Sequence, residues 1–153
     1  MDKEQVVTTM RTVVARVLED ASFVFSDDCA VDSRPDPAGW DAVGVSLTFG
    51  GEKSGVFRVW TDRPFAALLA ANMLGVDITG PDAEKKGTDA LREMVNIIAG
   101  NALTGLFGEV AVFNLGIPAP ADEKLKTEDC GRTDAVWLAA EDNTIVCVVD
   151  IHD

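Results

Sequence analysis

A carboxylate and a carboxamide lie one turn apart in the segment 89–101, where the apolar pattern predicts a long helix. At about 100° per residue, Asp89, Glu93 and Asn96 fall on one narrow arc together with Gly100. The apolar residues centre on the opposite side, as they do in a helix that packs on a core: Leu91, Met94, Val95, Ile98 and Ala102. We therefore expect these polar side chains to face solvent from a well-anchored helix, where they could act only on something brought to them.

Polar residues on this arc also have an ordinary explanation, because the outer face of an amphipathic helix must be solvated. Asp89, near the expected beginning of the helix, would favour the positive end of the helix dipole without any partner. Gly100 has two explanations: it would let the backbone of a partner approach closely, or it would allow the helix to pack on a sheet. Asn101 is interpreted as a residue that makes a structural hydrogen bond within the chain. The helical pattern alone does not decide between a solvated face and a site.

The complete spacing is more specific than the helical pattern. Asp89, three residues, Glu93, two residues, Asn96 and then twenty-one residues before Pro118 resemble the signature of the CheC/CheX/FliY phosphatases of bacterial chemotaxis. The run Glu93-x-x-Asn96-Ile-Ile-x-Gly100-Asn-Ala is especially similar to CheX. CheC-like proteins carry two copies of this unit and the sequence contains one, so a single-site CheX-like protein is the better match.

The resemblance implies a protein-aspartyl-phosphate phosphatase that acts on a phosphorylated CheY-like receiver domain. Its catalytic residues would be Asn96, which would position the attacking water, and Glu93, which would pair with a lysine of the receiver. Asp89, Gly100 and Pro118 would bind the partner, although Pro118 also suits a residue that shapes the loop after the helix. Mg²⁺ would be supplied by the receiver, so no cofactor and no metal ligand are expected in this chain.

Two other functions stay open at this stage. One is a non-catalytic module of the same fold that binds a receiver or a flagellar-switch component. The other is an unrelated α+β protein in which the spacing is accidental. A carboxamide at position 96 favours the phosphatase, since a protein that only binds has no need of one there.

Composition narrows the functional classes. The 153 residues, with 47% hydrophobic and 25% charged side chains, predict a single globular domain over residues 1–153. The net charge of −13 argues against nucleic acids and anionic membranes as partners, and no apolar run reaches the length of a membrane span. Cys29, Cys130 and Cys147 fit neither a disulfide framework nor a zinc site, and His152 is the only histidine. A cytoplasmic protein without histidine-based chemistry is expected.

The remaining pattern predicts an α+β fold, with a mostly antiparallel sheet and long helices packed on it, as in CheC and CheX. The expected elements are a helix over 4–20, a short strand around 23–25, a hairpin of strands 41–49 and 56–61, a helix from Asp62 to Gly75, a long helix from Ala83 or Thr88 to Phe107, an acidic surface loop over 121–127, and a hairpin of strands 135–140 and 145–151. The last two strands are apolar at nearly every position. We therefore expect them to be central or covered by a partner, which favours a homodimer.

Overall fold

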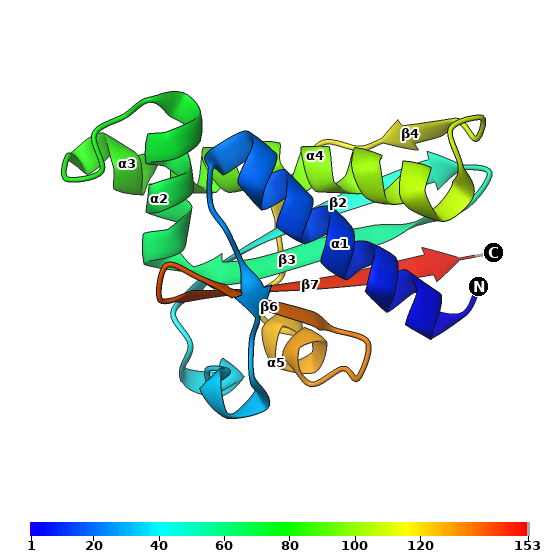
Figure 1. Ribbon diagram of the computed structural model, residues 1–153, viewed down its shortest axis with the longest axis horizontal. Helices are drawn as coiled ribbons and strands as arrows, with labels where there is room; N and C mark the ends of the chain where they lie inside the picture. The colour runs from blue at the N-terminus through cyan, green and yellow to red at the C-terminus, as the bar shows by residue number, and fades with distance from the viewer. Residues whose placement is uncertain (153) are drawn as a thin grey trace.

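The computed structural model of the protein describes residues 1–152 and contains one antiparallel sheet between two layers (Figure 1). The helices are α1 (Lys3–Ser22), α2 (Arg63–Leu74), α3 (Pro81–Lys85), α4 (Gly87–Phe107) and α5 (Leu125–Cys130), with short 3-10 turns η1 (Val31–Ser33) and η2 (Pro37–Gly39). The strands are β1 (Asp27–Asp28), β2 (Ala42–Gly51), β3 (Ser54–Asp62), β4 (Phe113–Leu115), β5 (Ala119–Pro120), β6 (Val136–Ala140) and β7 (Asn143–His152). Their spatial order is β1-β6-β7-β3-β2-β4, with β5 also paired to β2. The expected α+β fold is confirmed.

The hairpin of β2 and β3 follows from the alternation of its residues. Val45 and Leu47 of β2 are buried on the face that the long helices cover, and β2 pairs antiparallel with β3 from Ala42 to Phe49. At the end of β2, Gly51 has a φ of +135°, and a Cβ there would lie 2.5 Å from the carbonyl oxygen of Val112. Only glycine fits this position, where the chain turns beside the segment that follows α4.

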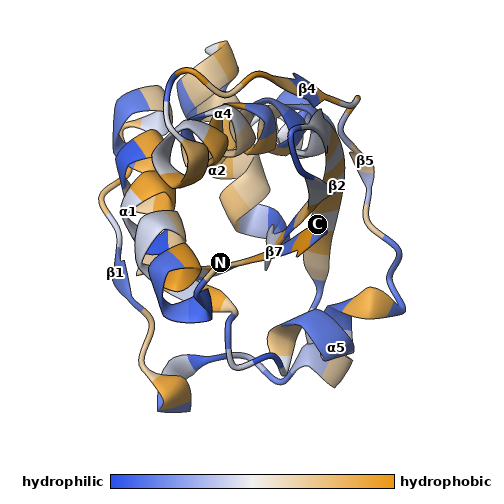
Figure 2. Ribbon diagram, turned by 90° about the vertical axis from the view of Figure 1, so that its right-hand side faces the viewer, coloured by the Kyte–Doolittle hydropathy of each residue, from blue (hydrophilic) through white to orange (hydrophobic). Residues whose placement is uncertain are grey.

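The helices α1, α2 and α4 pack on one face of the sheet and enclose the main core (Figure 2). The apolar stripe predicted for the long helix is completely buried in this core: Leu91, Met94, Val95, Ile98 and Ala102. At its beginning, α4 lies so close to α2 that a Cβ on Gly87 would be 3.1 Å from Ala66. The sheet and two helices therefore hold α4 in a fixed position.

The opposite face of the sheet carries a smaller core built around Trp40, Trp60 and Trp137. Asp129 of α5 is fully buried beside it, where its carboxylate accepts hydrogen bonds from Arg58 Nε at 2.8 Å and from Trp60 Nε1 at 2.9 Å. Because Arg58 and Trp60 belong to β3, this network fastens α5 to the sheet. The layer lies on the far side of the sheet from α4 (Figure 2).

Two predictions of local structure are wrong. No strand forms at 23–25, because α1 continues to Ser22, Phe23 adopts a left-handed conformation with φ 59°, and sheet pairing begins at Asp27. The acidic stretch 121–127 is not all surface loop, because α5 begins within it at Leu125. Lys126 is buried there, and its ammonium donates to the carbonyl oxygen of Trp40 at 2.6 Å.

The prediction that the last strand is central is confirmed. β7 lies between β6 and β3, and its apolar residues enter the two cores alternately, Ile145 and Cys147 on one side, Val146 and Val148 on the other. Both faces of this strand are therefore covered by the chain itself. The apolar character of β7 no longer argues for a second copy.

Candidate active site

The outer face of α4 presents the predicted polar residues together. Asp89, Glu93 and Asn96 are all exposed, and Gly100 continues the same face one turn after Asn96. Most of the residues between them are buried in the main core, so that burial on one side forces exposure on the other: Ala90, Leu91, Met94, Val95, Ile98 and Ala99. The structure thus confirms the geometry predicted for these four residues.

Glu93 and Asn96 have no partner within the chain. Over residues 1–152, neither side chain makes a hydrogen bond or an ion pair. Asp89 differs from them, because its carboxylate lies 3.6 Å from Arg92 Nη1 in a pair that is exposed on both sides. Such an exposed ion pair contributes about 0–1 kcal/mol to the free energy of unfolding. It therefore gives no structural reason for the free polar groups of Glu93 and Asn96 on the same face.

Gly100 has no packing role in this chain. A Cβ built at this position would meet nothing within 4 Å, which excludes the helix–sheet packing explanation. Asn101 behaves as a structural residue, since its Nδ2 donates to the carbonyl oxygen of Ile97 at 2.8 Å. Glycine in a helix interior lowers the stability by about 0.5–1 kcal/mol relative to alanine. No contact within the chain requires glycine at position 100.

Pro118 lies on a different element from the rest of the motif. It is half-buried in the extended segment between β4 and β5, both of which pair with β2. Gly116 anchors this segment by donating its N–H to the carbonyl oxygen of Thr48 at 2.7 Å. The four helical residues therefore share one face, whereas Pro118 lies at the edge of the sheet, on the segment between β4 and β5.

A groove adjoins the motif face on the side of α1. Gly100 and Asn101 line it from α4, Arg16 and Val17 line it from α1, and its volume is about 410 Å³. The spacing of the motif gives no indication that α1 borders this face. The available signal was Arg16, a charged residue set between the apolar Val13 and Val17.

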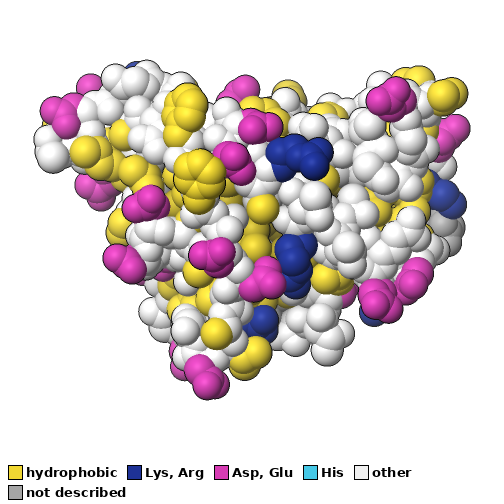
Figure 3. Space-filling model, in the orientation of Figure 1, with side chains coloured by type: hydrophobic (Ala, Val, Ile, Leu, Met, Phe, Trp, Pro, Cys, Tyr) yellow, Lys and Arg dark blue, Asp and Glu magenta, His cyan; other side chains and the backbone are white. Residues whose placement is uncertain are grey.

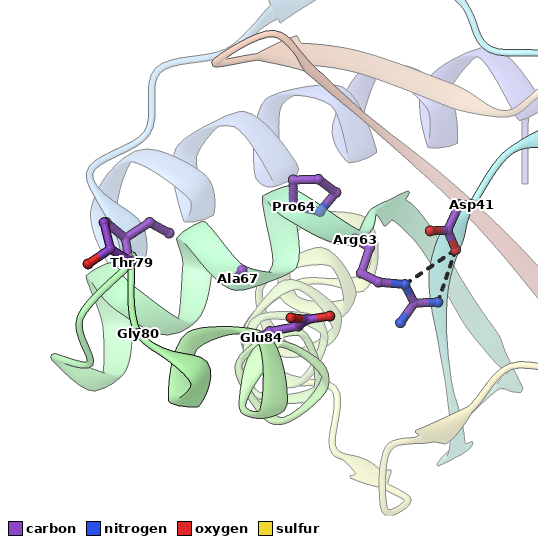
Figure 4. Close-up of a pocket in the computed structure, with 8 residues that line it drawn as sticks. Asp41, Arg63, Pro64, Ala67, Thr79, Gly80 and Glu84 are labelled. Carbon is purple, nitrogen blue, oxygen red and sulfur yellow. Dashed lines mark hydrogen bonds and ion pairs between the residues drawn. The ribbon is translucent and has the colours of Figure 1, made fainter.

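A second cavity of about 420 Å³ lies between the beginning of α2 and the segment before α3 (Figure 4). Its wall includes Asp41, Arg63, Thr79 and Glu84, and Arg63 Nη2 lies 3.1 Å from Asp41 Oδ1 in an exposed ion pair. No residue of the motif lines this cavity. It is therefore separate from the face that carries Glu93 and Asn96.

Two of the three cysteines, Cys130 and Cys147, do not offer an alternative nucleophile. Burial raises the pKa of Cys147 to about 12, and burial together with the neighbouring Asp129 raises the pKa of Cys130 to about 11. Because the thiolate is the nucleophilic form, both thiols are unreactive near neutral pH. In the part of the chain that the structure describes, no three His, Cys, Asp or Glu side chains gather into a metal site.

Comparison with known proteins gives a family and a set of similar folds. Residues 43–140, more than half of the chain, match the family described as chemotaxis phosphatase CheX. No curated protein sequence is significantly similar to the chain.

Three solved structures are similar over nearly the whole chain. The CheX of a CheX–CheY–BeF3–Mg²⁺ complex from Borrelia burgdorferi has 19% identity and a TM-score of 0.66, covering 96% of this chain and 97% of that one. A chemotaxis protein CheX from Desulfovibrio desulfuricans has 16% identity and a TM-score of 0.67, with 96% and 99% covered. CheX from Vibrio vulnificus has 17% identity and a TM-score of 0.66, with 98% and 99% covered.

Proposed function

The chain belongs to the CheX family of chemotaxis phosphatases, and on this premise we propose that it hydrolyses the aspartyl phosphate of a CheY-like receiver domain. The observation that carries the proposal is the pair of unpartnered side chains, Glu93 and Asn96, exposed on a helix that the core holds in place. A site that projects from the surface suits a substrate that is itself a folded protein with a partly enclosed phosphoryl group.

Asn96 is proposed to position the attacking water. Its amide oxygen can accept a hydrogen bond from the water while its NH₂ group donates to a phosphoryl oxygen. The side chain carries no charge that would repel the phosphate. The water oxygen forms a bond to phosphorus, the bond from phosphorus to the aspartyl oxygen breaks, and the receiver aspartate leaves as a carboxylate. The proton of the water passes to the released phosphate, and the enzyme contributes mainly position.

Glu93 is proposed to bind the receiver rather than the phosphate. A carboxylate would repel a phosphoryl group, but it attracts a lysine ammonium beside the phosphorylation site. Between protein surfaces that exclude water, this contact fixes the register of the two partners. Mg²⁺ is proposed to arrive with the receiver, which agrees with the Mg²⁺ present in the Borrelia burgdorferi complex.

Asp89, Gly100 and Pro118 are proposed to complete the partner surface. Gly100 allows close approach because nothing of this chain occupies the space above it. Asp89 borders the face at its beginning, with its charge partly satisfied by Arg92. Pro118 is proposed to contribute from the sheet edge, where its rigid ring would present a fixed surface to the receiver.

The decisive experiment is the loss of phosphoryl label from candidate receivers with and without the protein. Asn96→Ala should abolish the acceleration without lowering the thermal stability, because the Asn96 side chain makes no contact that the fold uses and alanine is the better helix former. An Asn96→Ala variant that stays fully active would overturn the water-positioning role. If the wild-type chain binds the receiver without accelerating the loss of label, the function is instead that of a non-catalytic binding module of this fold.

We also propose that two copies pair into a homodimer in the cytoplasm, with one motif helix exposed on each. The remaining support is the short edge strand β1, which pairs with β6 at two positions and is followed by one more hydrogen bond, from the N–H of Cys29 to the carbonyl oxygen of Trp137, so that β6 is covered over only part of its length. Among residues 1–152, no helix is both long and apolar enough to cross a bilayer. Light scattering that gives a monomer at micromolar concentration and physiological salt would overturn the dimer and leave the phosphatase proposal standing.

A further inference from the structure

The groove between α1 and α4 opens directly beside the proposed catalytic face. Gly100 belongs to both, because it shares the arc of Glu93 and Asn96 and also lines the groove. Helix geometry places it about 6 Å along α4 from Asn96. Figure 1 shows α1 crossing in front of α4, and the residues that line the groove come from these two helices. A partner that binds at Asn96 would therefore also contact this groove.

Glycines set the shape of the groove. At Gly105, α1 and α4 touch, since a Cβ there would lie 3.0 Å from the methyl group of Thr9. At Gly100, by contrast, a Cβ would meet nothing within 4 Å. The helices are thus closely packed at one end of the groove and leave its other end open toward the motif.

Arg16 is the charged residue of the groove, and it has no partner. Among the seven arginines within residues 1–152, six are matched to a carboxylate or to an aromatic ring. Arg16 makes no hydrogen bond, ion pair or ring contact in the same range and is exposed. The chain carries 26 acidic residues and a net charge of −13, so carboxylates were available to pair with it. Figure 3 shows how few basic side chains stand among the acidic ones on the face that α1 crosses.

The unpartnered charges are ordered along the docking face. Glu93 provides a negative charge, Asn96 follows as a neutral group, and Arg16 of α1 provides a positive charge in the groove that begins at Gly100. From Glu93 to Gly100 the distance along the helix is about 10 Å. A face with opposite charges at its two ends favours one orientation of a partner and penalises the reverse one.

We propose that this groove receives a carboxylate-bearing segment of the same receiver domain whose phosphoryl group faces Asn96, and that Arg16 binds that carboxylate. The inference rests on the proposed function, since it takes the receiver as the partner. It adds α1, which lies outside the residues 43–140 that match the family. Arg16 acts on affinity and orientation, while the chemistry stays with Asn96.

The test is the binding of a beryllofluoride-loaded receiver to wild-type protein, Arg16→Glu and Lys124→Glu. Lys124 is exposed in the layer on the other side of the sheet, so this control makes the same change of net charge away from the groove. Arg16→Glu should weaken binding at least about tenfold and raise KM with little change in kcat. Lys124→Glu should bind as the wild-type protein does, and raising the salt concentration should narrow the difference between wild type and Arg16→Glu.

The outcomes separate this inference from the proposed function because binding does not require hydrolysis. Equal affinity of wild type and Arg16→Glu would overturn the inference, whether or not the receiver is dephosphorylated. The same holds if Lys124→Glu weakens binding as much as Arg16→Glu, since the effect would then be one of net charge alone. Tenfold weaker binding by Arg16→Glu, in a protein that does not accelerate the loss of label, would support the groove and overturn the phosphatase. No binding by the wild-type chain would overturn both.

Discussion

Replacing Gly100 by alanine is expected to stabilise the protein and to weaken receiver binding at the same time. The new Cβ would meet nothing within 4 Å, so no clash opposes the substitution. Alanine in a helix interior is favoured over glycine by about 0.5–1 kcal/mol, and the free energy of unfolding should rise by that amount. In a chain of this size, 1 kcal/mol corresponds to about 2–4 °C in Tm.

The effect on binding has the opposite sign because the space above Gly100 is proposed to belong to the receiver. Inserting a methyl group into a packed contact costs about 1–3 kcal/mol, which is about 5- to 150-fold in Kd. Urea unfolding measures the first effect, and titration with a beryllofluoride-loaded receiver measures the second. Thr12→Ala is the matched control, because Thr12 is exposed on α1 outside the groove and also gains helix propensity.

Two results would refute this reasoning. Higher stability with unchanged receiver affinity would show that Gly100 contacts no partner. Unchanged or lower stability would show that the helix needs glycine there for its own packing. Gly75→Ala checks the calculation in the other direction, because Gly75 ends α2 with a φ of +72° and alanine should cost about 1–2 kcal/mol there.

Three further predictions concern charge. Glu93→Gln should weaken receiver binding and Glu93→Lys should weaken it more, since a cation would then face the lysine of the receiver; equal affinity of both variants with wild type would leave Glu93 a solvated residue. Asp129→Ala should lower the free energy of unfolding by about 3–5 kcal/mol in urea, because it leaves the nearly buried Arg58 without its main partner. The hydrogen bond from Arg132 lowers the pKa of Asp134, so their pairing stabilises the fold above the ordinary aspartate pKa and is lost as the pH falls through the lowered one. Unfolding from pH 6 to pH 2 should therefore show a smaller acid-induced loss of stability in Arg132→Met than in wild type.

The sequence by itself determined the motif helix and the direction of its faces. Helical periodicity places Glu93 and Asn96 opposite the apolar stripe, and burial of that stripe leaves them no other orientation. It also determined the hairpin of β2 and β3, whose alternation places Val45 and Leu47 on one face, since a slip of one residue would turn both to the other face. These features are local, because neighbouring residues in the chain decide them.

Predictions from the local sequence pattern were wrong where contacts with distant segments decide the secondary structure. Phe23 and Phe25 have the composition of a strand, yet both are more than 70% exposed, since α1 continues to Ser22 and the sheet offers no partner before Asp27. The acidic stretch before Cys130 forms a helix because Asp129 finds Arg58, which is 71 residues away. A charged residue is favoured at such a buried position only when its counter-ion is already there.

The same distinction applies to the candidate site. The spacing of the motif predicts which residues face outward, but Gly100 became informative only when the space around it was known. Arg16 and Gly100 are 84 positions apart, and only the packing of α1 on α4 brings them to one groove. Helical periodicity fixes the face of a residue within its own element. The surface of a second element that meets this face depends on how the whole core packs, and a single sequence does not state that packing.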